Sequence, residues 1–159
     1  MLTPKHMEQH LETPLKKSVA SGITEVCALL LAFLFAYTGI VKLYDWQETR
    51  LAMYNQVIPD WSQELLLYGI PVMELLLAVL LLVPRFRRMG FVISVILMGS
   101  FTAYVAWVWL GLAGRTPCSC GGIISSLTWG QHLIFNLVFL GISIVGVWME
   151  RKERMLDDR

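Results

Sequence analysis

Four long apolar stretches decide what this chain can fold into. Each is close to the ~20 residues that an α-helix needs to cross the hydrocarbon core of a bilayer. The composition agrees, because 56% hydrophobic and 16% charged residues with a mean hydropathy of +0.60 lie outside the range of soluble globular domains. The sequence therefore predicts an all-α integral membrane protein, a four-helix bundle in the lipid bilayer. The predicted spans are Val19 to Val41, Leu65 to Val83, Met89 to Leu112 and Trp129 to Met149.

The segments outside these stretches are too short for a second domain. We expect a cytoplasmic N-terminal segment over residues 1–18, the four-span domain over residues 19–149 and a cytoplasmic tail over residues 150–159. The first stretch is longer than the core of a cleaved signal peptide and follows an acidic-containing segment, so we interpret it as a retained span. Residues 45–58 show a loose helical pattern, which fits either an interfacial helix or an ordinary ordered loop.

The placement of Lys and Arg predicts the orientation. Ten of the 13 basic residues lie in the N-terminal segment, in the Pro84–Arg88 connection and in the tail. Basic residues near span ends stay in the cytoplasm. We therefore expect both termini in the cytoplasm of a bacterium, with the protein in the inner membrane and the first and third connections in the periplasm. A net charge of +1, without a basic stretch that carries exposed aromatics, gives no sign of a nucleic-acid partner.

The third connection contains Cys118 and Cys120, one residue apart. Disulfides form and persist in the periplasm. A pair at i and i+2 closes a small, strained ring, and strained disulfides are more readily reduced and more often catalytic. The pair predicts thiol–disulfide exchange with a periplasmic partner that is thioredoxin-like or rich in disulfides. Cys27, inside the first span, is interpreted as a small buried apolar residue.

Three other interpretations of the pair stay open. The two cysteines can form a static disulfide, remain unpaired thiols, or bind a metal together with His132. Two thiolates and one imidazole leave tetrahedral zinc a ligand short, and copper(I), which accepts few soft ligands, fits better. We assign no residue to a metal.

Glu74 is the outstanding polar residue inside a predicted span. An ionisable group at bilayer depth is costly and usually faces a bundle interior or a cavity. An isolated carboxyl there can donate a hydrogen bond to a quinone carbonyl or pass a proton. The alternative is a neutral Glu satisfied by a neighbouring helix. Lys42, at the end of the first span, is interpreted as an anchor that extends toward the lipid headgroups.

His132 and Asn136 lie one turn apart at the start of the fourth span, on the face that points toward the cysteines. His132 can handle the protons of thiol exchange, and its positive form would favour a thiolate. It can equally be a packing histidine that is hydrogen-bonded to Asn136 or Tyr104. Tyr104, in the third span, fits either an interfacial aromatic belt or the wall of a quinone pocket.

Four short motifs lie in or between the predicted spans: Tyr37–Leu43, Pro71–Leu75, Pro84–Arg85 and Pro117–Gly122, the last followed by His132 and Asn136. Together they resemble the MauE branch of the DoxX-like superfamily. The resemblance covers most of residues 19–149 and implies a four-helix bundle associated with periplasmic redox processes. In methylamine utilisation, it implies a link to producing or maturing the disulfide-rich small subunit of methylamine dehydrogenase.

The plan is also similar to that of DsbB and the vitamin K epoxide reductases, which couple disulfide exchange to a quinone. This chain has one outside cysteine pair where they have two. We therefore hypothesise a thiol–disulfide oxidoreductase whose catalytic residues are Cys118, Cys120 and His132. A quinone is the expected cofactor, bound near Glu74, Tyr104 and Asn136. The alternatives are a non-enzymatic membrane assembly factor with a structural cysteine pair and a metal-handling protein.

Overall fold

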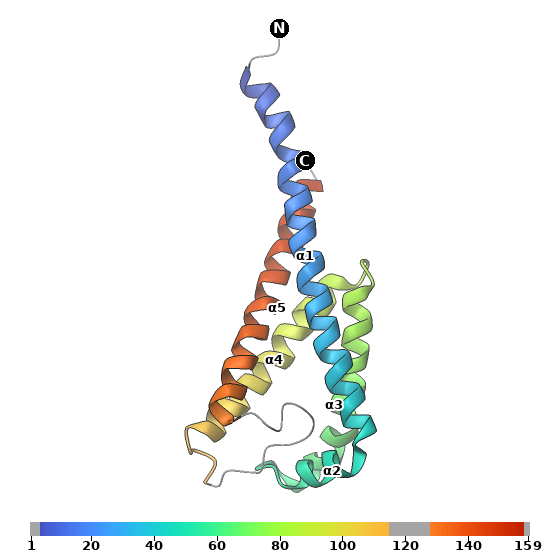
Figure 1. Ribbon diagram of the computed structural model, residues 1–159, viewed down its shortest axis with the longest axis vertical. Helices are drawn as coiled ribbons and strands as arrows, with labels where there is room; N and C mark the ends of the chain where they lie inside the picture. The colour runs from blue at the N-terminus through green and yellow to red at the C-terminus, as the bar shows by residue number, and fades with distance from the viewer. Residues whose placement is uncertain (1–3, 115–127, 158–159) are drawn as a thin grey trace.

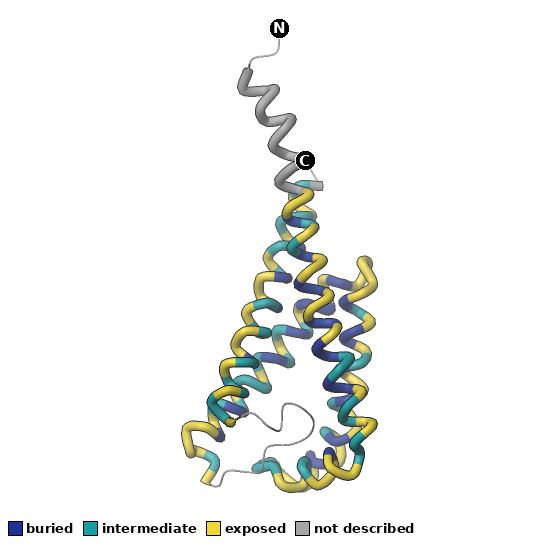
Figure 2. Tube along the Cα trace, viewed as in Figure 1, coloured by how far each residue is buried: buried dark blue, intermediate teal, exposed yellow. Residues whose placement is uncertain are grey.

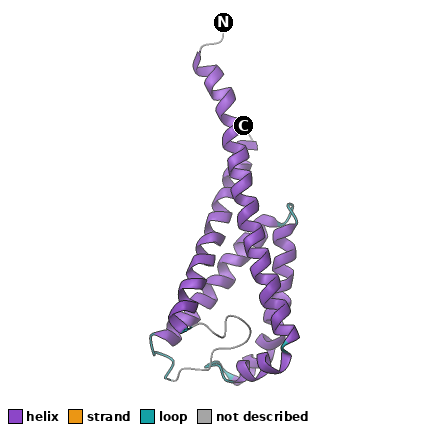
Figure 3. Cartoon of the chain, in the orientation of Figure 1, coloured by secondary structure: helices purple, strands orange, loops and turns teal. Residues whose placement is uncertain are grey.

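The computed structural model describes residues 4–114 and 128–157, with side chains described from Ser18 to Gly114 and from Thr128 to Leu156. Cys118 and Cys120 lie outside the described residues. Within the described ranges the chain is helical and contains no strand (Figure 3). The helices are α1 (Pro4–Tyr44), α2 (Trp46–Tyr54), α3 (Asp60–Leu82), α4 (Arg87–Trp109) and α5 (Trp129–Asp157).

Four of these helices are long and apolar enough to cross a membrane, which confirms the predicted fold class. The spans are Ser18–Tyr44, Asp60–Leu82, Arg87–Trp109 and Trp129–Leu156, with hydropathies from 2.0 to 2.4. The last continues beyond the predicted Met149 because the helix does not break where the charged residues begin. The third ends earlier than predicted, at Trp109. There the N–H groups of Gly111 and Leu112 bond to the carbonyls of Val108 and Trp107 and close the helix.

The first connection is mostly helical. Helix α2 occupies Trp46–Tyr54, so the interpretation of residues 45–58 as an ordinary loop is wrong over this part. Pro59 ends the connection, and α3 begins at the next residue, five residues before the predicted start of the second span. Asp60 in the first turn suits the positive end of the helix dipole.

The four long helices form two antiparallel pairs, α1 with α3 and α4 with α5 (Figure 1). Helix α1 also packs against α5, and α3 against α4, whereas α1 and α4 barely touch. The pairs lie close together near the α3–α4 connection and diverge toward α2. We call the end at which α2 lies the loop end.

The fully buried apolar core fills the closed part of the bundle, away from the loop end (Figure 2). Its largest members are Phe35, Phe91, Leu31, Leu77 and Leu81. Because this core holds the helices together at one end, the divergence at the loop end leaves space between the two pairs.

Candidate functional site

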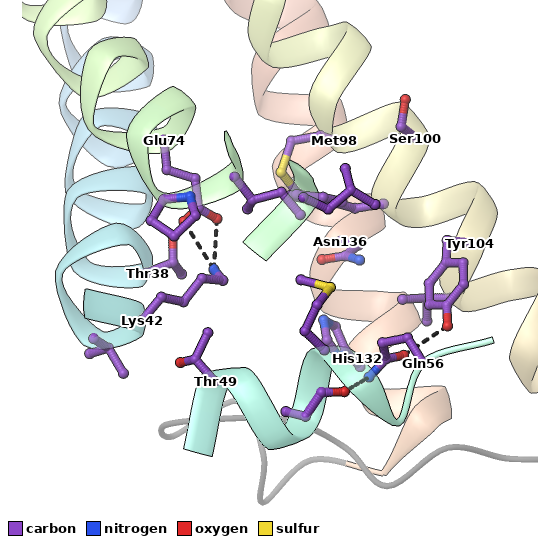
Figure 4. Close-up of a pocket in the computed structure, with 18 of the residues that line it drawn as sticks. Thr38, Lys42, Thr49, Gln56, Glu74, Met98, Ser100, Tyr104, His132 and Asn136 are labelled. Carbon is purple, nitrogen blue, oxygen red and sulfur yellow. Dashed lines mark hydrogen bonds and ion pairs between the residues drawn. The ribbon is translucent and has the colours of Figure 1, made fainter. Parts of the chain in front are cut away.

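A cavity of about 390 Å³ lies between the two helix pairs at the loop end (Figure 4). All five helices contribute to its lining, and α2 with the residues that follow it covers the loop end. Its size falls in the range of small-molecule sites. Most of the lining is aliphatic or aromatic, including Phe35, Phe101 and Phe135, and each of the five helices adds at least one polar side chain.

The strongest polar contact in the cavity joins Lys42 of α1 to Glu74 of α3. The Lys42 Nζ donates to both carboxylate oxygens, at 2.8 Å to Oε1 and 3.0 Å to Oε2. The Glu74 side chain is only 2% exposed, whereas that of Lys42 is 32% exposed. The Thr38 hydroxyl lies beside the carboxylate (Figure 4).

This ion pair corrects two of the predictions. Lys42 is not a headgroup anchor, because its ammonium points into the bundle. Glu74 is not an isolated carboxyl but is held by the neighbouring helix as one half of an ion pair. The physical reason is that a carboxylate with almost no access to water needs a partner of opposite charge, and the long lysine side chain reaches it across the helix contact.

Close packing of α1 against α3 brings the two charges together. Gly39 lies at the contact, where a Cβ atom would be 3.1 Å from the Leu75 side chain and 3.3 Å from the Pro71 carbonyl oxygen. Helix α1 therefore approaches α3 beside Glu74. Lys42 follows Gly39 by three residues and so lies on the same side of α1.

Helix α5 contributes His132 and Asn136 to the cavity lining. Asn136 is 4% exposed, and its Nδ2 has no hydrogen-bond partner among the described residues. The half-buried His132 lies close enough to Lys42 for the two to interact electrostatically. The alternative of a packing histidine bonded to Asn136 does not operate through Asn136 Nδ2, which has no partner among the described residues.

Tyr104 lines the cavity from α4 and ties it to the connection after α2. Its hydroxyl donates to Gln56 Oε1 at 2.7 Å and accepts from the Val57 N–H at 3.3 Å. Glu74, Tyr104, His132 and Asn136, all selected from the sequence, thus line one cavity. Their roles in binding or catalysis stay predictions.

Sequence reasoning missed Lys42 as a site residue. The available signal was a basic residue one turn beyond Thr38 in the first span, together with an acid in the second. Two unlike charges in neighbouring spans are candidates for an ion pair.

The cysteine pair is not part of the described site. The described chain leaves the bundle at Gly114 and returns at Thr128, both at the loop end (Figure 1). Among the residues that the structure describes, no group of three or more His, Cys, Asp or Glu side chains is arranged to hold a metal ion. The copper interpretation depends on Cys118 and Cys120, which lie outside that part of the chain.

Comparisons with known proteins identify the family. A family model described as methylamine utilisation protein MauE matches residues 20–149. No curated protein and no solved structure matches the chain. The matched region contains the second and third spans, most of the first and fourth, and every polar residue of the cavity named above. The chain belongs to the MauE family of membrane proteins.

Proposed function

We propose that this protein carries out thiol–disulfide exchange through Cys118 and Cys120 with a partner protein on the periplasmic side of the bacterial inner membrane. The observation that supports this best is the cavity at the loop end, where the Lys42–Glu74 ion pair and His132 belong to one largely apolar lining. The orientation follows from the distribution of Lys and Arg described above.

Chain connectivity keeps the cysteines within reach of the loop end. Cys118 follows Gly114 by four residues, which span at most about 14 Å when fully extended. His132 is the fourth residue of α5, which starts at the same end of the bundle. It is therefore the described side chain best suited to exchange protons with the thiols.

The exchange starts with a disulfide between Cys118 and Cys120. A thiolate of the partner attacks one sulfur and forms a mixed disulfide, and the second thiol of the partner resolves it. The partner leaves as a disulfide and the pair becomes a dithiol, so two electrons and two protons have been transferred. Because the chain has one such pair, the partner must supply the other; a thioredoxin-like or disulfide-rich protein has the required chemistry.

A membrane quinone then restores the disulfide. The dithiol gives up two electrons and two protons, the quinone takes up both and leaves as a quinol, and the S–S bond forms again. The cavity is where we place this quinone, near Glu74, Tyr104 and Asn136. Its charged and polar side chains are suited to supplying and removing protons within the bundle.

Single cysteine variants test the proposal. Cells that carry Cys118→Ser or Cys120→Ser are treated with acid to quench exchange, and mixed disulfides are sought on non-reducing gels. A single variant cannot form the Cys118–Cys120 disulfide, so a mixed disulfide arises in it only by the reverse step, in which the remaining thiolate attacks the disulfide of the oxidised partner. We expect one of the two variants to accumulate this species and the double variant to form none. Cys27→Ala is the matched control, because that thiol is buried in α1; it should behave like the natural chain.

Thiol labelling with and without reductant provides the second readout. The proposal requires part of the Cys118/Cys120 population to be oxidised in cells and to shift to the reduced form when quinone synthesis is blocked. A pair that is permanently reduced contradicts it. So does a double Cys→Ser variant with full activity, which is the behaviour of a membrane assembly factor.

A further inference from the structure

Asn136 carries a buried donor that the described protein does not satisfy. Its side chain lies in the cavity between Met98 and His132 (Figure 4), and its Nδ2 has no hydrogen-bond partner among the described residues. A buried donor left unpaired destabilises the folded state. A residue of this kind inside a cavity points to an acceptor atom that arrives with a ligand.

Lys42 offers a second donor on the opposite side of the cavity. An ammonium group has three N–H bonds, and two of those on Lys42 are directed at the Glu74 oxygens. The third has no partner among the described residues and can be donated to a ligand. Because Glu74 already neutralises the charge of Lys42, an anionic ligand would be repelled by the carboxylate, and an uncharged ligand with acceptor oxygens fits better.

The rest of the lining restricts the shape of the ligand. Phe35, Phe101 and Phe135 present aromatic rings, which suit a flat, conjugated group. The exposed Ser100 of α4 also belongs to the lining, so the cavity extends to the outer surface of a membrane-spanning helix. A ligand that dissolves in the bilayer can approach from this side.

We propose that the cavity binds the head group of a quinone, with Asn136 Nδ2 donating to one carbonyl oxygen and Lys42 Nζ donating to the other. The ligand needs an acceptor for Asn136, an uncharged acceptor for Lys42 and a flat, lipid-soluble body. A quinone has two carbonyls on an uncharged planar ring and an apolar tail, and so meets all three requirements. The inference rests on the proposed function, in which a quinone reoxidises the cysteine pair, and it adds the two residues that recognise the quinone.

Direct binding to the full chain tests the assignment. The protein carries Cys118→Ser and Cys120→Ser, so that no thiol chemistry contributes, and is purified in detergent until free of quinone. Decylubiquinone is then titrated by calorimetry. We expect saturable binding that Asn136→Leu weakens about tenfold, the effect of losing one hydrogen bond to a neutral acceptor.

Two further measurements separate recognition from packing. Asn136→Leu should leave the thermal midpoint of the quinone-free protein unchanged or higher, because it removes an unpaired donor. Ser143→Ala is the matched control on α5: Ser143 is fully buried too, but its hydroxyl donates to the Phe139 carbonyl at 2.8 Å, and it does not line the cavity. It should leave quinone binding unchanged.

The inference is overturned if decylubiquinone shows no saturable binding, or if it binds Asn136→Leu and the parent protein equally. It is also overturned if a diacylglycerol, which has ester carbonyls but no ring, displaces the quinone at equal concentration. If Asn136→Leu does not fold, the parent chain is labelled with a photoreactive azidoquinone and the labelled residues are identified. Labels confined to the cavity lining support the site, and scattered labels or none refute it.

These results are independent of the fate of the cysteines. Quinone binding together with a permanently reduced Cys118/Cys120 pair would remove the proposed function and leave this site standing. Thiol exchange in cells without quinone binding would remove this site alone.

Discussion

Breaking the Lys42–Glu74 ion pair from its two sides should have unequal effects on stability. The Glu74 side chain is 2% exposed and that of Lys42 is 32% exposed. Lys42→Met leaves a carboxylate in the bundle without its partner, and removing one member of a buried pair costs about 3–5 kcal/mol. Glu74→Gln leaves a lysine that can still reach water, and the amide keeps one acceptor oxygen, so we expect a cost of about 1 kcal/mol.

The free energy of unfolding of the double variant Lys42→Met/Glu74→Gln tests this reasoning most directly. The variant removes both charges and leaves a neutral amide, so it should cost about 1–2 kcal/mol and be more stable than Lys42→Met alone. The three costs imply that the two substitutions are coupled by about 2–5 kcal/mol, because the residues are in direct contact.

The assay is reversible unfolding in mixed micelles by increasing SDS, followed by helical circular dichroism and analysed as a double-mutant cycle. Lys152→Met serves as the matched control. It also removes a lysine from a helix, but this ammonium lies over the Trp148 ring at 5.7 Å, where its loss should cost less than about 1 kcal/mol. Equal costs for Lys42→Met and Glu74→Gln, or a double variant as unstable as the sum of the two, would refute the reasoning.

Two further predictions use the same unfolding assay. Gly146→Ala should destabilise the protein by about 1–3 kcal/mol, because the new Cβ would lie 2.2 Å from the ring of the buried Phe91. Gly141→Ala, in the same helix with nothing within 4 Å, should be neutral or slightly stabilising, and similar values for the two would contradict the packing described. Arg87 of α4 and Glu25 of α1 form an ion pair, with 2.8 Å between Nη1 and Oε2. Glu25→Gln should cost less than about 1 kcal/mol, since Glu25 is half exposed. Arg87→Met should cost about 2 kcal/mol, because the buried Arg87 also donates to the Leu81 carbonyl. A larger cost for Glu25→Gln than for Arg87→Met would show that this backbone hydrogen bond does not contribute to stability.

The four spans were predictable because hydropathy is a local property. A run of apolar residues favours the bilayer whatever surrounds it, so the number of spans and their centres follow from the chain itself. The ends were less predictable. Helix α5 continues into charged residues as far as Asp157. Charged residues mark where a chain leaves the bilayer, but they do not break an α-helix. Helix α4 stops at Trp109, where backbone hydrogen bonds close it.

Most polar members of the candidate site were predictable, whereas Lys42 and the arrangement of the site were not. Glu74, His132, Asn136 and Tyr104 were selected because polar groups in apolar helices are costly and usually face an interior. That they line one cavity depends on how the two helix pairs diverge. The partner of Tyr104 shows the same limit, because Gln56 is 48 residues away in the chain and no local pattern connects them.

By itself the sequence determined that this is a four-span membrane protein with polar residues at a few inner positions, because burial in lipid acts on each helix separately. The tertiary structure alone decided that Lys42 neutralises Glu74 and that Asn136 keeps an unpaired donor. Both depend on which helix faces which. The close contact at Gly39 brings α1 to α3, whereas the divergence at the loop end holds Asn136 away from any described partner.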